Sequence, residues 1–266
     1  MSVVLSLCLL VSGCSSRNTR DDEAILWIHA ASSLEELIRG LGDAFSEKNG
    51  IEVRYNFAGS NTLAQQIAGS RVSGIFVSAD EYWTDFVVER RADVVDRAKM
   101  PFGNSLAVVT AHRSGIRSVE APEALADLEV EYWVMGNPES VPAGRYARAW
   151  LESISLIGDD SLWAIVSDKI SPTLSVRSAV AQVSRVPGSV GVVYRSDLLR
   201  FSKDLKPVYV SRSDDLPIIT YYAVSLSGDY PKGGSEQRFE AFVEFLRTEP
   251  ARMLIDDLGF SRPLSL

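Results

Sequence analysis

The chain has 266 residues, of which 46% are hydrophobic and 23% are charged, and its formal net charge is −8. This length allows one large domain or two lobes with buried cores. The acidic balance argues against nucleic acid as a partner, because no run of Lys and Arg could neutralise a phosphate backbone. A site for a small anion would therefore depend on local dipoles and not on long-range attraction.

The first residues have the pattern of a secretory signal. Residues 1–13 are apolar and end in small residues, and Cys14 and a polar stretch follow. Because a membrane-spanning helix needs about 20 apolar residues, this segment is too short to cross a bilayer and is predicted to be removed. The alternative is a short buried helix with an ordinary core cysteine. Cys8 lies in the removed segment, so the mature chain would hold no thiol pair for a disulfide or a metal site. Residues 15–24 are predicted to form a polar tether.

The first repeating unit is a strand, a turn of small residues and a helix. Residues 25–28 are predicted to be a buried strand, and Ala30 and Ala31 a tight turn. Ser32 and Ser33 then precede a helix whose apolar residues recur at helical spacing from 34 to 45. A serine here is either a helix N-cap or part of an anion site made with the free helix N–H groups. Both interpretations stay open on this stretch alone.

The same pattern returns in the next unit. Residues 51–57 alternate apolar and polar side chains, as a strand does, and a small-residue turn with Ser60 leads into another helix. Two such turns at the carboxyl ends of neighbouring parallel strands would face one crevice. A third strand is predicted at 75–79. Asp80 follows it as the expected N-cap of a helix, a role that contributes about 1 kcal/mol.

Residues 101–104 are predicted to break the pattern, and the strand at 106–111 then begins a second lobe. After a strand at 130–135, Ala143 and Gly144 stand at a helix start, where small side chains would let a ligand reach the backbone; a helix start with no ligand is equally possible. Val176 opens another helix. Tyr194 ends a strand at 190–194, where its hydroxyl either packs or donates into a cleft. Residues 156–172 cannot be assigned.

The remaining elements are strands at 208–210 and 218–226 and a helical end, with the second of these strands returning toward the first lobe. Strands and helices alternate along most of the chain, which predicts an α/β fold. The predicted division is a signal at 1–14, a tether at 15–24, lobe 1 at 25–102 and 215–266, and lobe 2 at 103–214.

Several segments carry a family resemblance. They are AASSL (30–34), FAGSNTLAQQI (57–67), FVSADEYWTDF (76–86), GNSLAVV (103–109), GNPESVPAGRYA (136–147), VRSAVAQV (176–183), GVVYRSD (191–197) and LGF (258–260). In this order they resemble the molybdate-binding proteins of bacterial ABC importers. That family has the two-lobe type II periplasmic-binding-protein fold, with a ligand cleft between the lobes.

The resemblance implies a site for molybdate or tungstate. Carried over by motif, the binding residues are Ser33 and Ser60 through their hydroxyls, Ala143 and Val176 through their backbone N–H groups, and Tyr194 through its hydroxyl. Molybdenum would be held only as the oxyanion, and no cofactor is expected. Arg145 and Arg177 are expected to lie outside direct contact with the anion.

The same resemblance implies the cellular setting. Residues 11–14 resemble the lipobox of bacterial lipoproteins, in which the cysteine, here Cys14, is acylated, although no Lys or Arg precedes the apolar run. The expected protein is a monomeric, membrane-anchored lipoprotein outside the cytoplasm, in the periplasm or on the cell surface, with an ABC permease as its partner. Three departures from the family pattern are His29, Ser73-Gly74 and a longer segment at 152–175.

The residue types suit a fully deprotonated dianion, which accepts hydrogen bonds and has no proton to donate. A protonated phosphate would bring a hydroxyl that finds no acceptor, whereas sulfate would have to be excluded by size. The sequence does not separate molybdate from tungstate. The alternatives are a binder of another oxyanion such as sulfate or phosphate, and a tethered oxyanion sensor.

An enzyme is the least favoured class. The chain has only two histidines, and it has no G-x-S-x-G motif of a serine hydrolase. His29 stands four residues before Ser33 on a strand that is predicted to be buried. It is therefore interpreted as a packed, hydrogen-bonded core residue and not as a base, and no catalytic residue is predicted.

Overall fold

The computed structural model describes residues 25–156, 158, 160–211, 219–229 and 234–261. The signal segment, the tether and Cys14 lie outside this part of the chain. The strands are β1 (Ile25–Ala31), β2 (Glu52–Ala58), β3 (Gly74–Ser78), β4 (Val94–Asn104), β5 (Leu106–Ala111), β6 (Tyr132–Gly136), β7 (Ile170–Thr173), β8 (Ser189–Tyr194), β9 (Leu205–Val210) and β10 (Ile219–Leu226). The helices are α2 (Glu35–Asn49), α3 (Ser60–Ala68), α4 (Glu81–Arg90), α5 (Pro142–Ser153), α6 (Leu162–Val166), α7 (Val176–Val183), α8 (Arg195–Arg200), α9 (Ser235–Phe245) and α10 (Glu249–Asp257), with short 3₁₀ turns η1 (Ser32–Leu34), η2 (Pro122–Asp127) and η3 (Ser167–Lys169).

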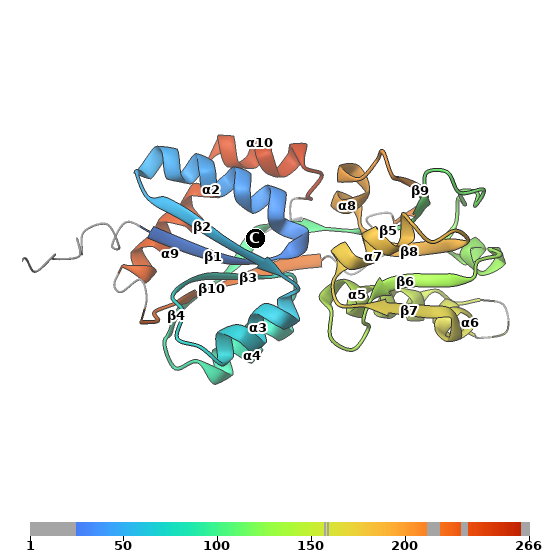
Figure 1. Cartoon of the computed structure of the whole chain (residues 1–266), viewed down its shortest axis with the longest axis horizontal. Helices are drawn as coiled ribbons and strands as arrows, with labels where there is room; N and C mark the ends of the chain where they lie inside the picture. The colour runs from blue at the N-terminus through green and yellow to red at the C-terminus, as the bar shows by residue number, and fades with distance from the viewer. Residues whose placement is uncertain (1–24, 157, 159, 212–218, 230–233, 262–266) are drawn as a thin grey trace, which may run out of the picture.

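The strands form two five-stranded sheets, which lie in the left and right halves of Figure 1. The first sheet has the order β2-β1-β3-β10-β4, and the second has the order β7-β6-β8-β5-β9. In each sheet four strands run in the same direction, and one strand, β10 in the first sheet and β5 in the second, runs antiparallel to both of its neighbours. The chain passes to the second sheet between β4 and β5 and returns between β9 and β10. This is the two-lobe α/β architecture that the sequence predicts.

Helices cover both sheets and bury their apolar faces against them. In the first half α2, α9 and α10 pack over a core that includes Phe45, Phe239 and Phe242, and the ring of Phe45 meets that of Phe242 edge to face. A smaller apolar cluster, which includes Leu63 and Trp83, lies beneath α3 and α4. Within the described residues, no helix has both the length and the apolar character that a membrane span requires.

The structure corrects two predicted boundaries and assigns one stretch that the sequence leaves open. Ala30 and Ala31 are not a turn but the end of β1, where they pair with Phe57 and Ala58 of β2. The break predicted at residues 101–104 is also wrong, because β4 runs through it to Asn104 and its last residues pair with β10. Pro101 is tolerated there because β4 is an edge strand and its pairing register shifts at this point, so a missing N–H leaves no gap in the ladder. The unassigned stretch contains α6 and β7.

Candidate functional site

A small hollow lies where the two halves meet, and all five predicted ligand residues line it. The lining residues are Ala31, Ser32, Ser33, Gly59, Ser60, Ala79, Val141, Pro142, Ala143, Ser175, Val176 and Tyr194. Its volume is about 10 Å³, close to the smallest space that holds one water molecule. An ion larger than water therefore enters only if the walls move slightly apart.

Four element starts meet at this hollow. Ser33 lies in η1, Ser60 is the first residue of α3, Ala143 the second residue of α5, and Val176 the first residue of α7. The first N–H groups of a helix have no partner inside the helix, and they carry the positive end of its dipole. None of the residues that line the hollow is charged. The polar groups that the described residues place at the wall of the hollow are therefore uncharged, and these helix N–H groups and hydroxyls can donate hydrogen bonds.

The two serines are not N-caps, which removes the structural alternative for them. No side-chain cap is made at the start of η1 or of α3, and the position before α3 is Gly59. The hydroxyl oxygen of Ser60 instead accepts a hydrogen bond from the N–H of Ala79, at 3.1 Å. Because this bond uses a lone pair of Ser60 Oγ, the hydroxyl proton stays available to an acceptor in the hollow.

Ser33 is oriented from behind by residues that sequence reasoning did not identify. Its side chain is hydrogen-bonded to the hydroxyl of Tyr221 on β10. That hydroxyl accepts a bond from Asn104 Nδ2 at 3.0 Å, and the same Nδ2 donates to Ser196 Oγ at 2.8 Å. The Ser33 hydroxyl is therefore held against β10 through Tyr221, at the wall of the hollow.

In the second half, small residues bring the backbone of α5 against the end of β6. A Cβ at Gly144 would lie 2.0 Å from the carbonyl oxygen of Gly136, so only glycine permits this approach. The approach fixes the first turn of α5, and with it Ala143, at the wall of the hollow. At α7, Ser175 is the N-cap and accepts from the N–H of Ser178, so it leaves the N–H of Val176 for another acceptor.

Tyr194 ends β8, and its hydroxyl is buried without a hydrogen-bond partner among the described residues. Burial raises the pKa of this hydroxyl well above its ordinary value, with the neighbouring Tyr221 and Tyr146 adding to the effect. The hydroxyl therefore keeps its proton at neutral pH and remains a donor. A buried donor without a partner costs about 1–3 kcal/mol, which an acceptor placed in the hollow would recover.

Neither Arg145 nor Arg177 lines the hollow, in agreement with the sequence interpretation. Arg145 of α5 lies 3.6 Å from the carboxylate of Asp80, across the junction between the halves. Asp80 accepts the N–H of Trp83, as the predicted N-cap should. Burial raises the pKa of Asp80, while the Trp83 N–H and Arg145 oppose this rise.

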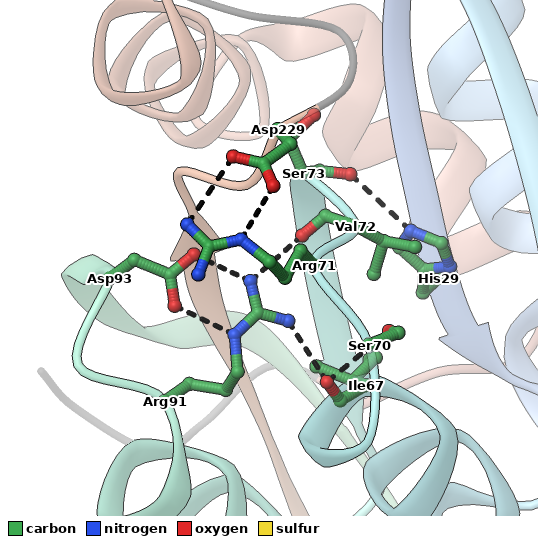
Figure 2. Close-up of polar contacts among 9 residues, drawn as sticks. All are labelled: His29, Ile67, Ser70, Arg71, Val72, Ser73, Arg91, Asp93 and Asp229. Atoms are coloured by element: carbon green, nitrogen blue, oxygen red, sulfur yellow. Dashed lines mark hydrogen bonds and ion pairs between the residues drawn. The ribbon is translucent and has the colours of Figure 1, made fainter.

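His29 is a packed core residue, as predicted. Its Nε2 faces the carbonyl oxygen of Ser73 at 3.4 Å (Figure 2), and its Nδ1 faces Asn56 Nδ2 at 3.3 Å. These contacts fit a neutral ring that donates from Nε2 and accepts at Nδ1. Burial lowers the pKa of His29. Neither nitrogen is bonded to Ser33, so this pair does not have the arrangement of a base and its nucleophile.

A larger cavity of about 520 Å³ lies elsewhere in the first half and is lined in part by Arg71, Arg90 and Arg91. The buried Arg91 donates to the carbonyl oxygens of Ile67 and Val72 and pairs with Asp93. Arg71 pairs with Asp229 (Figure 2). These arginines join the loop after α3 to the neighbouring segments and already have carboxylate partners, so the cluster has a structural role.

Comparisons with known proteins agree with this architecture. The sequence profile of the bacterial extracellular solute-binding protein family matches residues 26–261. The molybdate-binding protein ModA of Haemophilus influenzae is 30% identical over 238 residues, which cover 88% of this chain and 89% of that protein. ModA of Escherichia coli is 29% identical over 248 residues, which cover 92% and 91% of the two chains. The periplasmic molybdate-binding protein of Azotobacter vinelandii shares the fold, with a TM-score of 0.71 at 19% identity over 90% of this chain and 99% of that one.

Proposed function

The chain belongs to the bacterial extracellular solute-binding protein family, and we propose that it captures molybdate or tungstate outside the cytoplasm for import by an ABC transporter. In this proposal the anion lies in the hollow between the halves. It accepts hydrogen bonds from the hydroxyls of Ser33, Ser60 and Tyr194 and from the backbone N–H groups of Ala143 and Val176. The protein binds and releases the anion without catalysis.

The observation that carries this proposal is the set of donors around the hollow. Five residues from five separate elements line it, none of its lining residues is charged, and the buried hydroxyl of Tyr194 has no partner in the described part of the chain. Each hydrogen bond to a charged acceptor contributes about 1.5–3 kcal/mol. Five of them total about 7.5–15 kcal/mol before the cost of ordering and closure is subtracted, and only the upper part of this range corresponds to nanomolar affinity, near −12 kcal/mol.

The donor set also supports a choice among anions. Ser60 Oγ already accepts a bond from the N–H of Ala79, so its proton is available to an anion in the hollow. A monohydrogen phosphate brings a hydroxyl that needs an acceptor in the hollow, and this unmet need lowers its affinity. Sulfate has no proton, so its rejection rests on the size at which the walls close.

We also propose the setting that the sequence implies. Residues 25–102 and 215–266 act as one lobe, which also takes in Gly103 and Asn104 because they pair with β10, and the rest of residues 103–214 acts as the other. The lobes open and close about the two chain crossings. The protein works as a monomer that is anchored by acylation of Cys14 and docks on the permease of the importer.

Isothermal titration calorimetry of the purified protein with molybdate, tungstate, sulfate and phosphate tests the function. We expect submicromolar binding of molybdate or tungstate, and at least 100-fold weaker binding of the other two anions. Tight sulfate or phosphate binding without molybdate heat would identify a different oxyanion carrier. The absence of heat with all four anions would refute the proposal.

A further inference from the structure

Arg177 connects the two halves directly beside the hollow. It is the second residue of α7 and follows Val176. Its Nε donates to the carbonyl oxygen of Ser32 at 3.2 Å, and its Nη2 pairs closely with the carboxylate of Glu36 on α2. Both partners belong to the first half, whereas α7 packs on the second sheet.

A second arginine completes this contact. Arg200 of α8 pairs with the other oxygen of Glu36 at 2.5 Å, so the carboxylate lies between two guanidinium groups of the second half. The guanidinium groups of Arg177 and Arg200 both lie over the ring of Phe201, which limits their freedom. Glu36 lies in the first turn of α2, where the helix dipole also favours a negative charge.

Arg177 has a partner in its own half as well. The buried carboxylate of Asp197 lies 3.4 Å from Arg177 Nε. Because Asp197 belongs to the same half as Arg177, a separation of the halves would keep this pair and break the contacts with Ser32 and Glu36. Arg177 therefore has one partner, Asp197, in both the open and the closed arrangement of the halves, and two further partners, Ser32 and Glu36, only in the closed one.

The contacts of Arg177 adjoin two proposed ligand donors. The Ser32 carbonyl immediately precedes Ser33, and Arg177 immediately follows Val176. The bond between Arg177 and the Ser32 carbonyl therefore fixes the distance between the adjoining proposed donors, Val176 of the second half and Ser33 of the first. A cavity of about 290 Å³ lies next to the hollow, and Ser33, Glu36, Arg177 and Arg200 contribute to its wall.

We propose that Arg177, with Glu36 as its partner across the junction, is a positioning residue that holds the two halves in register around the bound anion and slows its release. The proposal rests on the proposed function, because holding the two halves together slows release only if an anion is bound between them. Arg177 does not touch the anion. It acts after the anion has entered, so its loss shortens the lifetime of the complex and leaves association nearly unchanged.

Stopped-flow fluorescence of the purified protein with molybdate separates these rates. Trp83 of the first half donates to the carbonyl oxygen of Ser140 in the second half at 2.7 Å, so its emission should report closure. For Arg177→Gln we expect release to accelerate by roughly 10- to 100-fold, as for a lost charged hydrogen bond, and association to change by less than about three-fold.

Glu36→Gln tests the same contact from the other half. It leaves the pair between Arg177 and Asp197 intact, so it remains informative if Arg177→Gln weakens folding. We expect faster release again. The double variant should release molybdate more slowly than the product of the two single effects predicts, because both changes remove the Arg177–Glu36 pair, whereas only Arg177→Gln also removes the bond to Ser32 and only Glu36→Gln also changes the pair with Arg200.

Arg148→Gln is the matched control. Arg148 also pairs with two carboxylates, those of Glu139 and Glu152, but all three lie within the second half. The Arg148→Gln variant should release molybdate at the same rate as the wild type. Release within two-fold of wild type in both Arg177→Gln and Glu36→Gln, or equal acceleration in Arg148→Gln, would overturn the proposal. A wild-type protein that binds no oxyanion would instead refute the proposed function, so the two failures are distinguishable.

Discussion

Replacing Tyr194 with Phe should have opposite effects on the bound and the anion-free protein. The Tyr194 hydroxyl is buried at the wall of the hollow and has no partner among the described residues. With the anion bound, its removal deletes one bond to a charged acceptor, so affinity should fall by about 1.5–3 kcal/mol, or roughly 10- to 100-fold. Without the anion, nothing in the described structure is lost. The free energy of unfolding should stay the same or rise by up to about 3 kcal/mol, because the unpaired hydroxyl is gone.

Calorimetry with molybdate gives the first quantity, and urea denaturation of the anion-free protein gives the second. The control is Tyr55→Phe, because the Tyr55 hydroxyl donates to Asp43 at 2.8 Å, away from the hollow. That variant should bind molybdate as the wild type does and lose a little stability. A Tyr194→Phe protein that is clearly less stable without the anion, or that binds molybdate with unchanged affinity, would refute the reasoning.

Three further predictions concern the walls of the hollow and its surroundings. Ser60→Ala should weaken molybdate binding by about 1–3 kcal/mol in calorimetry and leave the protein folded; wild-type affinity would show that the site is misassigned. Gly144→Ala would place a Cβ 2.0 Å from the Gly136 carbonyl oxygen, so urea denaturation should show a loss of about 1–3 kcal/mol or more, whereas Gly115→Ala has open space and should show no such loss. Burial raises the pKa of Asp197 to about 6, above the value of about 3.9 in an unfolded chain, so the folded state binds the additional proton between these values. Stability should therefore rise by about 1 kcal/mol as the pH falls from 7 to 5, and Asp197→Asn should abolish this rise.

The positions of Ser33 and Ser60 in the fold could be predicted because their signals are local. A buried strand that ends in small residues and a hydroxyl before an amphipathic helix is a pattern within about ten residues. It places Ser33 and Ser60 at the carboxyl ends of the parallel strands β1 and β2. The boundary at Ala30 and Ala31 was missed because small side chains suit a turn and a buried strand equally well.

The contacts behind the donors could not be predicted, because they join residues far apart in the chain. Tyr221 reaches Ser33 from β10, and Asn104 is 117 residues before Tyr221. Arg177 and Glu36 are 141 residues apart. Helical periodicity indicates which face of a helix is buried, but it does not indicate which distant charged residue a side chain of that helix will contact. For Arg177 the sequence predicted only a position outside direct contact with the anion.

The strand order of the first sheet has a consequence for how the chain folds. β10 lies between β3 and β4, although it follows them in sequence by more than a hundred residues. The second sheet uses only strands from Leu106 to Val210 and can assemble as soon as that stretch has been synthesised. The first sheet must wait for β10, with the edges of β3 and β4 unpaired until then. Such long-range pairing is slow, so the half that is synthesised first should be the last to complete its native structure.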